Sequence, residues 1–101
     1  MKPCCKEYLM EQFGDEEIVK EIYAEYANSI REKLPEFESA LASDDWTGLD
    51  KLAHAVKGNA LATGDNELAD VAISLRAAAK MSEKDTARTL FEKIKLLAQE
   101  I

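Results

Sequence analysis

The sequence contains few residues that break helices or crosslink chains, and it lacks an excess of basic residues. Its 101 residues include 4 glycines, 2 prolines and 2 cysteines, and 47% are hydrophobic. This composition excludes disordered, collagen-like and disulfide-rich chains. Acidic residues outnumber basic ones by 20 to 13, for a net charge of −7. Nucleic acids and anionic membranes are therefore not expected as partners, because both require clustered positive charge.

Membrane and export segments are also missing from the sequence. No apolar run approaches the roughly 18 residues that span a bilayer, and the first six residues lack the apolar stretch of a signal peptide. We therefore expect a cytoplasmic protein.

Cys4 and Cys5 are adjacent, a spacing that rarely permits good disulfide geometry. Together with one histidine, they are too few for a four-ligand zinc site. They are expected to be free thiols on a short helix, with a redox or metal role as the alternative.

The residues that are abundant predict helices. Ala, Leu, Glu and Lys dominate, and no stretch alternates apolar and polar residues over six positions. A short helix over about 4–13 should end at Gly14, and Asp15 should cap a long helix that follows it. The apolar spacing of that helix stays in phase across Pro35, which predicts one helix to about residue 42, kinked at the proline. A helix stop at Pro35 is the alternative.

Three more helices are expected in the second half. Asp44 or Asp45 can cap a helix from Trp46 to about Thr63, with Gly64 as the left-handed residue past its end. Asp65 is expected to cap the next helix, and Lys80–Met81 is expected to form the turn after that helix. Ser82 with Asp85 resembles the capping box of a last helix, whose apolar residues continue to Ile101.

Four amphipathic helices joined by short turns pack most simply as an antiparallel up-and-down bundle. The prediction is an all-α single domain over residues 1–101, with the short N-terminal helix against one end of the bundle. The aromatic residues on the helix stripes should form core rather than a base-stacking surface: Tyr23, Tyr26, Phe37 and Phe91. The acidic runs at 15–17 and 65–67 are interpreted as caps and solvated charge, with partner selection as the alternative.

The single histidine of the sequence, His54, is predicted to point into solvent. At about 100° per residue, the apolar residues of its helix fall on an arc between about 160° and 240° from His54; they are Leu49, Leu52, Val56, Ala60 and Thr63. His54 therefore lies nearly opposite the core-facing side. An idle surface histidine is the alternative to a functional one.

Four neighbours share the exposed face of His54 and favour a functional role. Lys57 places a positive charge beside the ring, and Leu61 is an exposed apolar residue of the kind found at docking surfaces. Gly58 costs roughly 1 kcal/mol relative to alanine inside a helix, which is tolerable if a large group must approach the imidazole. Asp50, one turn earlier, can accept a hydrogen bond from Nδ1 and fix the tautomer, or it is a solvated surface charge.

These residues carry a resemblance to a known family. The stretch from Leu52 to Ala60, which contains His54, Lys57 and Gly58 as His-x-x-Lys-Gly, resembles the histidine-containing phosphotransfer (HPt) domain of multistep phosphorelays. Gly64, ten residues after the histidine, and the length, helix order and proline of the whole chain agree with that family. Asn59 and Thr63 depart from it, since smaller and aliphatic residues are commoner there.

The resemblance implies reversible phosphoryl transfer. Nε2 of His54 would attack the aspartyl phosphate of a receiver domain; an ordinary histidine, with a pKa near 6.5, has the required free lone pair at cytosolic pH. Lys57 would neutralise the spreading negative charge, and Gly58 would admit the phosphoryl group. Asp50→Ala is expected to lower the transfer rate. No cofactor is expected on this chain, and Mg²⁺ is expected on the partner receiver.

The implied partners are response-regulator receiver domains and a hybrid sensor histidine kinase, and the protein is expected to be a monomer. The sequence has no glycine-rich nucleotide loop or ATP-binding module, so it is a carrier that cannot phosphorylate itself. Two alternatives stay open: a non-catalytic adaptor bundle that binds receivers, and the phosphorylated domain of a chemotaxis-type histidine kinase.

Overall fold

The computed structural model describes all 101 residues and contains five helices and no strands. The helices are α1 (Pro3–Phe13), α2 (Glu16–Ala42), α3 (Trp46–Thr63), α4 (Asn66–Lys80) and α5 (Lys84–Ala98). The all-helical fold predicted from composition is confirmed, and none of the helices is both long and apolar enough to cross a membrane.

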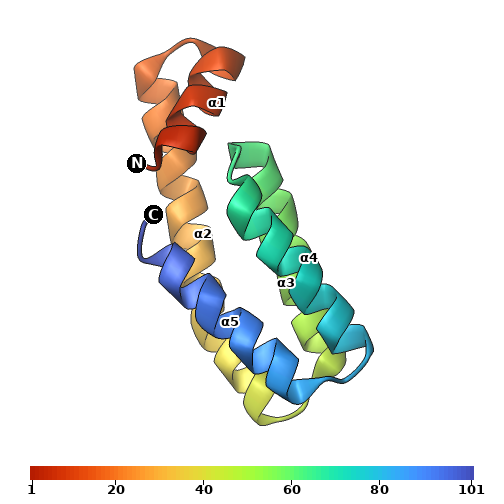
Figure 1. Ribbon diagram of the computed structural model, residues 1–101. Coiled ribbons are helices and arrows are strands. Elements are labelled where there is room, and N and C mark those ends of the chain that lie inside the picture. Colours follow the sequence, from red (N-terminus) through yellow and green to blue (C-terminus); the bar gives the residue numbers. More distant parts are fainter.

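The helices α2 to α5 lie side by side and enclose the core. Figure 1 shows that the chain turns back after α2, α3 and α4, so that α5 returns to pack beside α2. The contact between α3 and α4 is the most extensive of all, and α1 packs against α2 and the near end of α3. The molecule is elongated, at 42 × 20 × 19 Å, and both ends of the chain lie near the upper part of α2 (Figure 1).

The helix ends follow the sequence signals closely at α2, α3 and α4. Asp15 accepts a hydrogen bond from the Glu17 amide at 2.9 Å, and Asp45, rather than Asp44, accepts one from the Gly48 amide at 2.9 Å. Gly64 has the left-handed φ of +79° expected past the end of α3. The alternative of a helix stop at Pro35 is wrong, because α2 continues without a break from Glu16 to Ala42.

The predicted capping box at the start of α5 is wrong. The residue at the N-cap is Glu83, and its side chain makes no capping hydrogen bond. Ser82 instead has a left-handed φ of +53°, and its amide bonds to the carbonyl of Ala79 at 3.1 Å. Ser82 therefore belongs to the end of α4, where orphan carbonyls need donors, and it is not available to cap the next helix.

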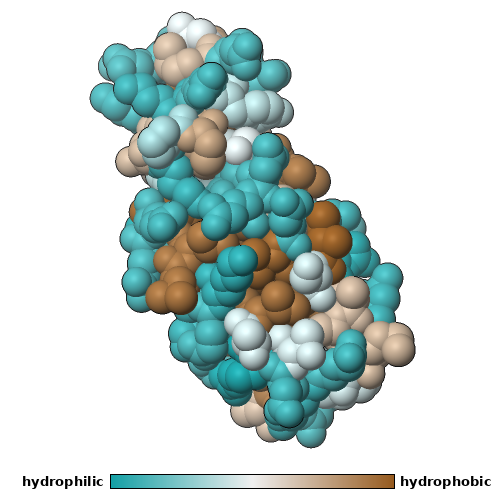
Figure 2. Space-filling model, in the orientation of Figure 1, coloured by the Kyte–Doolittle hydropathy of each residue, from teal (hydrophilic) through white to brown (hydrophobic).

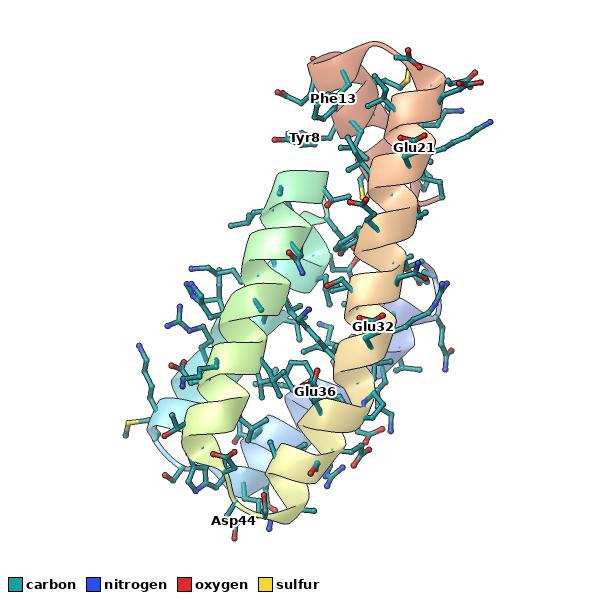
Figure 3. All side chains as sticks on the ribbon, turned by 180° about the vertical axis from the view of Figure 1, so that it is seen from behind. Tyr8, Phe13, Glu21, Glu32, Glu36 and Asp44 are labelled. Carbon is teal, nitrogen blue, oxygen red and sulfur yellow. The ribbon has the colours of Figure 1, made fainter.

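The core is one cluster of 25 buried residues drawn from all five helices. The aromatic residues predicted to be core are buried in it: the rings of Phe37 and Phe91 stack at 5.3 Å, and those of Tyr23 and Tyr26 meet edge to face at 6.0 Å. The outer face of α2 is acidic, with Glu21, Glu32 and Glu36 directed away from the bundle (Figure 3).

Asp65 caps α4 as predicted, but it is not a solvated charge. Its side chain is fully buried, accepts hydrogen bonds from the Lys2 ammonium at 3.0 Å, and also accepts one from the Tyr26 hydroxyl at 2.7 Å. Burial, together with the bond to this carboxylate, raises the pKa of Tyr26 well above its usual range. The interpretation of 65–67 as surface charge failed at Asp65 because the partner lysine is 63 residues away in sequence.

The start of the chain is held against the α3–α4 turn by this buried pair and by close packing. Tyr8 lies between α1 and the upper end of α3 (Figure 3), and a Cβ at Gly64 would come within 2.5 Å of the Cβ of Tyr8. Any side chain at position 64 would therefore displace α1 and would also be strained by the positive φ.

Candidate functional site

His54 is exposed in the middle of α3, on the side of the helix away from the core. Five residues of the same helix are buried: Leu49, Ala53, Val56, Ala60 and Thr63. The helical periodicity therefore predicted correctly that the imidazole points out of the bundle. No other helix covers the ring, although one of its nitrogens is in contact with a side chain from α4.

That side chain is Arg76. Its Nη1 lies 2.9 Å from Nδ1 of His54, while its Nε donates a hydrogen bond of 2.9 Å to Oδ1 of Asp50. The Arg76 guanidinium, bonded to the carboxyl of Asp50, holds the pKa of Asp50 below its usual range. Asp50 is thus neither a direct partner of the ring nor a free surface charge, and both sequence interpretations of this residue are corrected. Nε2 of His54 makes no hydrogen bond within the chain.

Three basic residues gather in a hollow between α3 and α4 despite the overall negative charge, and one of them, Arg76, contacts the imidazole. Lys57, Arg76 and Lys80 line an open hollow of about 260 Å³, together with Ile73 and Ala77. Lys57 comes from α3 and the other two cations come from α4. A dianionic group bound to His54 would therefore lie close to positive charge that is fixed by both helices.

Gly58 is exposed, one helical turn from His54, and its surroundings are open. A Cβ built at this position would meet nothing within 4 Å apart from its chain neighbours and the backbone of its own helix, and the backbone there does not have a positive φ. The fold itself therefore does not require glycine at position 58. The interpretation that the missing side chain leaves room for a visiting group is compatible with this geometry.

Two exposed apolar residues belong to the helices that form the basic hollow, and one of them, Ile73, lines it. Leu61 on α3 and Ile73 on α4 each leave 48% of their surface open to solvent. Figure 2 shows the face of the molecule that carries α4 and α5, where hydrophobic residues gather over the middle of the bundle and hydrophilic residues cover its ends. Leu61 was named from the sequence, whereas Ile73 was not.

Sequence reasoning also missed Arg76 and Lys80, although a signal for both was present. The turn at Asp65 joins two helices of equal rise, so residues equally distant from it face each other. His54 lies eleven positions before Asp65 and Arg76 lies eleven after. Asp50 and Lys80, fifteen positions on either side, likewise line one hollow. Equal distances from position 65 would have placed Arg76 at the same level as His54, although the contact itself depends on how the two helices are rotated about their axes.

The two residues that depart from the family pattern lie behind the site. Asn59 donates a hydrogen bond of 3.0 Å from its amide to the hydroxyl of Ser29 on α2, and Thr63 donates one of 2.7 Å to the Asn59 carbonyl. The polar group of Asn59 is thus paired across the α2–α3 contact, and that of Thr63 is paired within α3. Neither touches His54, so they alter helix packing rather than the exposed face.

Comparison with known proteins supports the same family. The family model described as "Hpt domain" matches residues 21–101, which leaves only α1 and the start of α2 outside the match. No curated protein and no solved structure matches the chain. With an exposed histidine in the His-x-x-Lys-Gly pattern on an all-helical fold, and with this match over most of its length, the chain belongs to the Hpt domain family of phosphorelay proteins.

Proposed function

We propose that this chain is a phosphocarrier. It accepts a phosphoryl group on Nε2 of His54 from the aspartyl phosphate of one receiver domain and passes the group reversibly to another receiver. A carrier role in phosphorelays is the general function of the family. The observation that supports the specific proposal is an exposed imidazole whose Nε2 makes no hydrogen bond and whose Nδ1 contacts Arg76, one of three cations that line a hollow between α3 and α4.

The transfer consists of one displacement at phosphorus. The lone pair of Nε2 forms the N–P bond, the P–O bond to the receiver's carboxylate breaks, and the carboxylate leaves with that electron pair. Such reactions depend mainly on positioning the reacting groups and on neutralising the negative charge of the phosphoryl oxygens. Lys57 is proposed to supply that charge on this chain. Mg²⁺ is proposed to be held by the receiver.

Docking is proposed to use the face around His54. Gly58 is proposed to leave the approach to the ring open, which is supported by the empty space around its Cα, and Leu61 is an exposed apolar residue on the same helix that a receiver can cover. Asp50 is proposed to act on this face through Arg76 and not by contact with the ring.

We further propose that α2 to α5 form an antiparallel up-and-down four-helix bundle. The protein is proposed to work as a monomer in the cytoplasm, and the phosphoryl donor is proposed to be a hybrid sensor histidine kinase.

Incubation with a phosphorylated receiver tests the proposal. The wild-type chain should gain an acid-labile, base-stable label, and His54→Gln should gain none while keeping its helical circular dichroism spectrum. A wild-type chain that binds the phosphorylated receiver but stays unlabelled would instead be a receiver-binding adaptor. Because the chain has one histidine, the label needs no further assignment among imidazoles.

A further inference from the structure

The contact between Arg76 and His54 determines where the neutral imidazole carries its proton. Nη1 of Arg76 lies 2.9 Å from Nδ1. A guanidinium has only N–H donors and remains protonated in proteins, so Nδ1 must be the acceptor and must carry the lone pair. A neutral His54 in this arrangement therefore has its proton on Nε2.

That tautomer is the wrong one for attack through Nε2. Attack requires a lone pair on Nε2, and a neutral ring that offers it carries its proton on Nδ1. Arg76 has no acceptor for an Nδ1 proton. The contact must therefore open, and the ring proton must move from Nε2 to Nδ1 through solvent, before a phosphoryl group is taken up.

The same contact is favourable once His54 is phosphorylated. With phosphorus on Nε2, loss of the Nδ1 proton to water leaves a neutral ring whose lone pair on Nδ1 can again accept a bond from Arg76. The P–N bond of a phosphohistidine breaks most easily when Nδ1 is protonated, because the leaving group is then a neutral imidazole rather than an imidazolate. A donor held at Nδ1 competes with that proton.

A second hydrogen bond anchors Arg76 beside the ring. Its Nε is bonded to Asp50, and only 25% of its side-chain surface is exposed. Arg76 thus contacts two residues of α3, Asp50 and His54, from its place on α4. A freely moving surface arginine would lose more conformational entropy on holding one nitrogen of the ring.

We propose that Arg76 is a positioning residue that keeps Nδ1 of His54 unprotonated and thereby lengthens the lifetime of the phosphohistidine between the two transfers. This inference deepens the proposed function and rests on it for its biological meaning. Its chemistry, however, can be tested without any receiver domain.

The first test reads the tautomer of the unphosphorylated protein. Long-range ¹H–¹⁵N correlation NMR of the neutral His54 ring should show one dominant tautomer in the wild type. In that tautomer Nε2 carries the proton and Nδ1 is unprotonated. Arg76→Met keeps the length of the side chain and removes the donor, and should give a mixture of tautomers. A predominantly protonated Nδ1 in the wild type would overturn the proposal.

The second test measures the stability of the P–N bond. Phosphoramidate phosphorylates imidazoles chemically with release of ammonia, so the single histidine can be loaded without a partner. The label should decay about three- to tenfold faster in Arg76→Met than in the wild type, a range typical of losing one exposed charge-assisted hydrogen bond. Arg76→Lys, which also only donates, should restore much of the lifetime.

A matched arginine elsewhere provides the control. Arg88 on α5 pairs with Glu38 at 3.0 Å and is also partly exposed, so Arg88→Met should leave the lifetime unchanged. Equal decay in the wild type and Arg76→Met, or equal acceleration in Arg88→Met, would refute the role of Arg76. If the loaded protein behaves as expected but no receiver ever loads it, the proposed function fails and the tautomer assignment stands.

Discussion

Asp50 and Arg76 face each other across the α3–α4 contact, and Oδ1 of Asp50 accepts a hydrogen bond of 2.9 Å from Nε of Arg76. The bond lowers the pKa of the carboxyl. A lowered pKa in the folded state means that the stabilisation is present above the ordinary carboxyl value and is lost only as pH falls through the lowered value. The pair is therefore complete at neutral pH, where a phosphocarrier would work.

Replacing Asp50 should weaken the hold of Arg76 on the ring. In Asp50→Ala the guanidinium keeps its charge but loses its anchor, so phosphoramidate-loaded His54 should decay faster than in the wild type, by a smaller factor than in Arg76→Met. The decay of the label at fixed pH measures this. The original reason for expecting slower transfer in Asp50→Ala, a direct bond to Nδ1, does not apply, and an unchanged lifetime would show that Arg76 needs no anchor.

Removing the charge of Lys57 should slow phosphoryl transfer. Lys57→Gln removes one of the three cations beside the hollow, and we expect a loss of about tenfold in the rate of uptake from a phosphorylated receiver, equivalent to about 1.4 kcal/mol of transition-state stabilisation. Rapid-quench measurement of the label gives this rate. Lys93→Gln, an exposed lysine on α5, is the control and should transfer at the wild-type rate.

Side chains at position 58 should separate folding from transfer. Because a Cβ there meets nothing within 4 Å, Gly58→Ala should fold and gain about 0.5–1 kcal/mol of stability from the better helix propensity of alanine. Gly58→Leu should also fold but should take up phosphoryl groups far more slowly, since its side chain fills the approach to His54. Thermal melts and transfer rates measure the two effects; wild-type transfer by Gly58→Leu would refute the clearance role.

Loss of the Lys2 ammonium should destabilise the whole fold. Burial disfavours this cation, but the bond and charge of Asp65 outweigh burial and raise the pKa of Lys2. Lys2→Met leaves a buried carboxylate without its cation, for an expected loss of about 3 kcal/mol in the free energy of unfolding. Urea denaturation measures it, with the exposed Lys6→Met as control. A loss no larger than in that control would contradict the prediction.

The pH dependence of this pair has a definite sign. Since the pKa of Lys2 is raised in the folded state, its stabilisation is complete below the ordinary lysine value of 10.5 and disappears as pH rises through the raised value. The difference in stability between the wild type and Lys2→Met should therefore shrink as the solution becomes strongly alkaline and Lys2 loses its proton.

The two cysteines should differ sharply in reactivity. Cys4 is exposed, whereas Cys5 is fully buried, and burial raises the pKa of Cys5 to about 12. Since the thiolate is the reactive form, a disulfide reagent at pH 8 should modify one thiol quickly and the other only on unfolding. Cys4→Ser should abolish the fast phase; a fast phase that persists in it would contradict the burial of Cys5.

Local features of this protein could be predicted from the sequence because they depend on neighbours within one turn. The cap at Asp15, the left-handed Gly64 and the outward direction of His54 all follow from spacings of three to four residues. The same local reasoning failed at Ser82, where the end of one helix and the start of the next compete for the same residue and the pattern does not say which prevails.

The sequence by itself determined the helices, their buried faces and the exposure of the histidine with its lysine and glycine. Only the tertiary structure decided that Arg76 reaches Nδ1 and that Lys2 is buried against Asp65. Those contacts join residues 22 and 63 positions apart, and they depend on the rotation and stagger of packed helices. The periodicity of apolar residues along one helix does not specify how that helix is rotated or staggered against its neighbours.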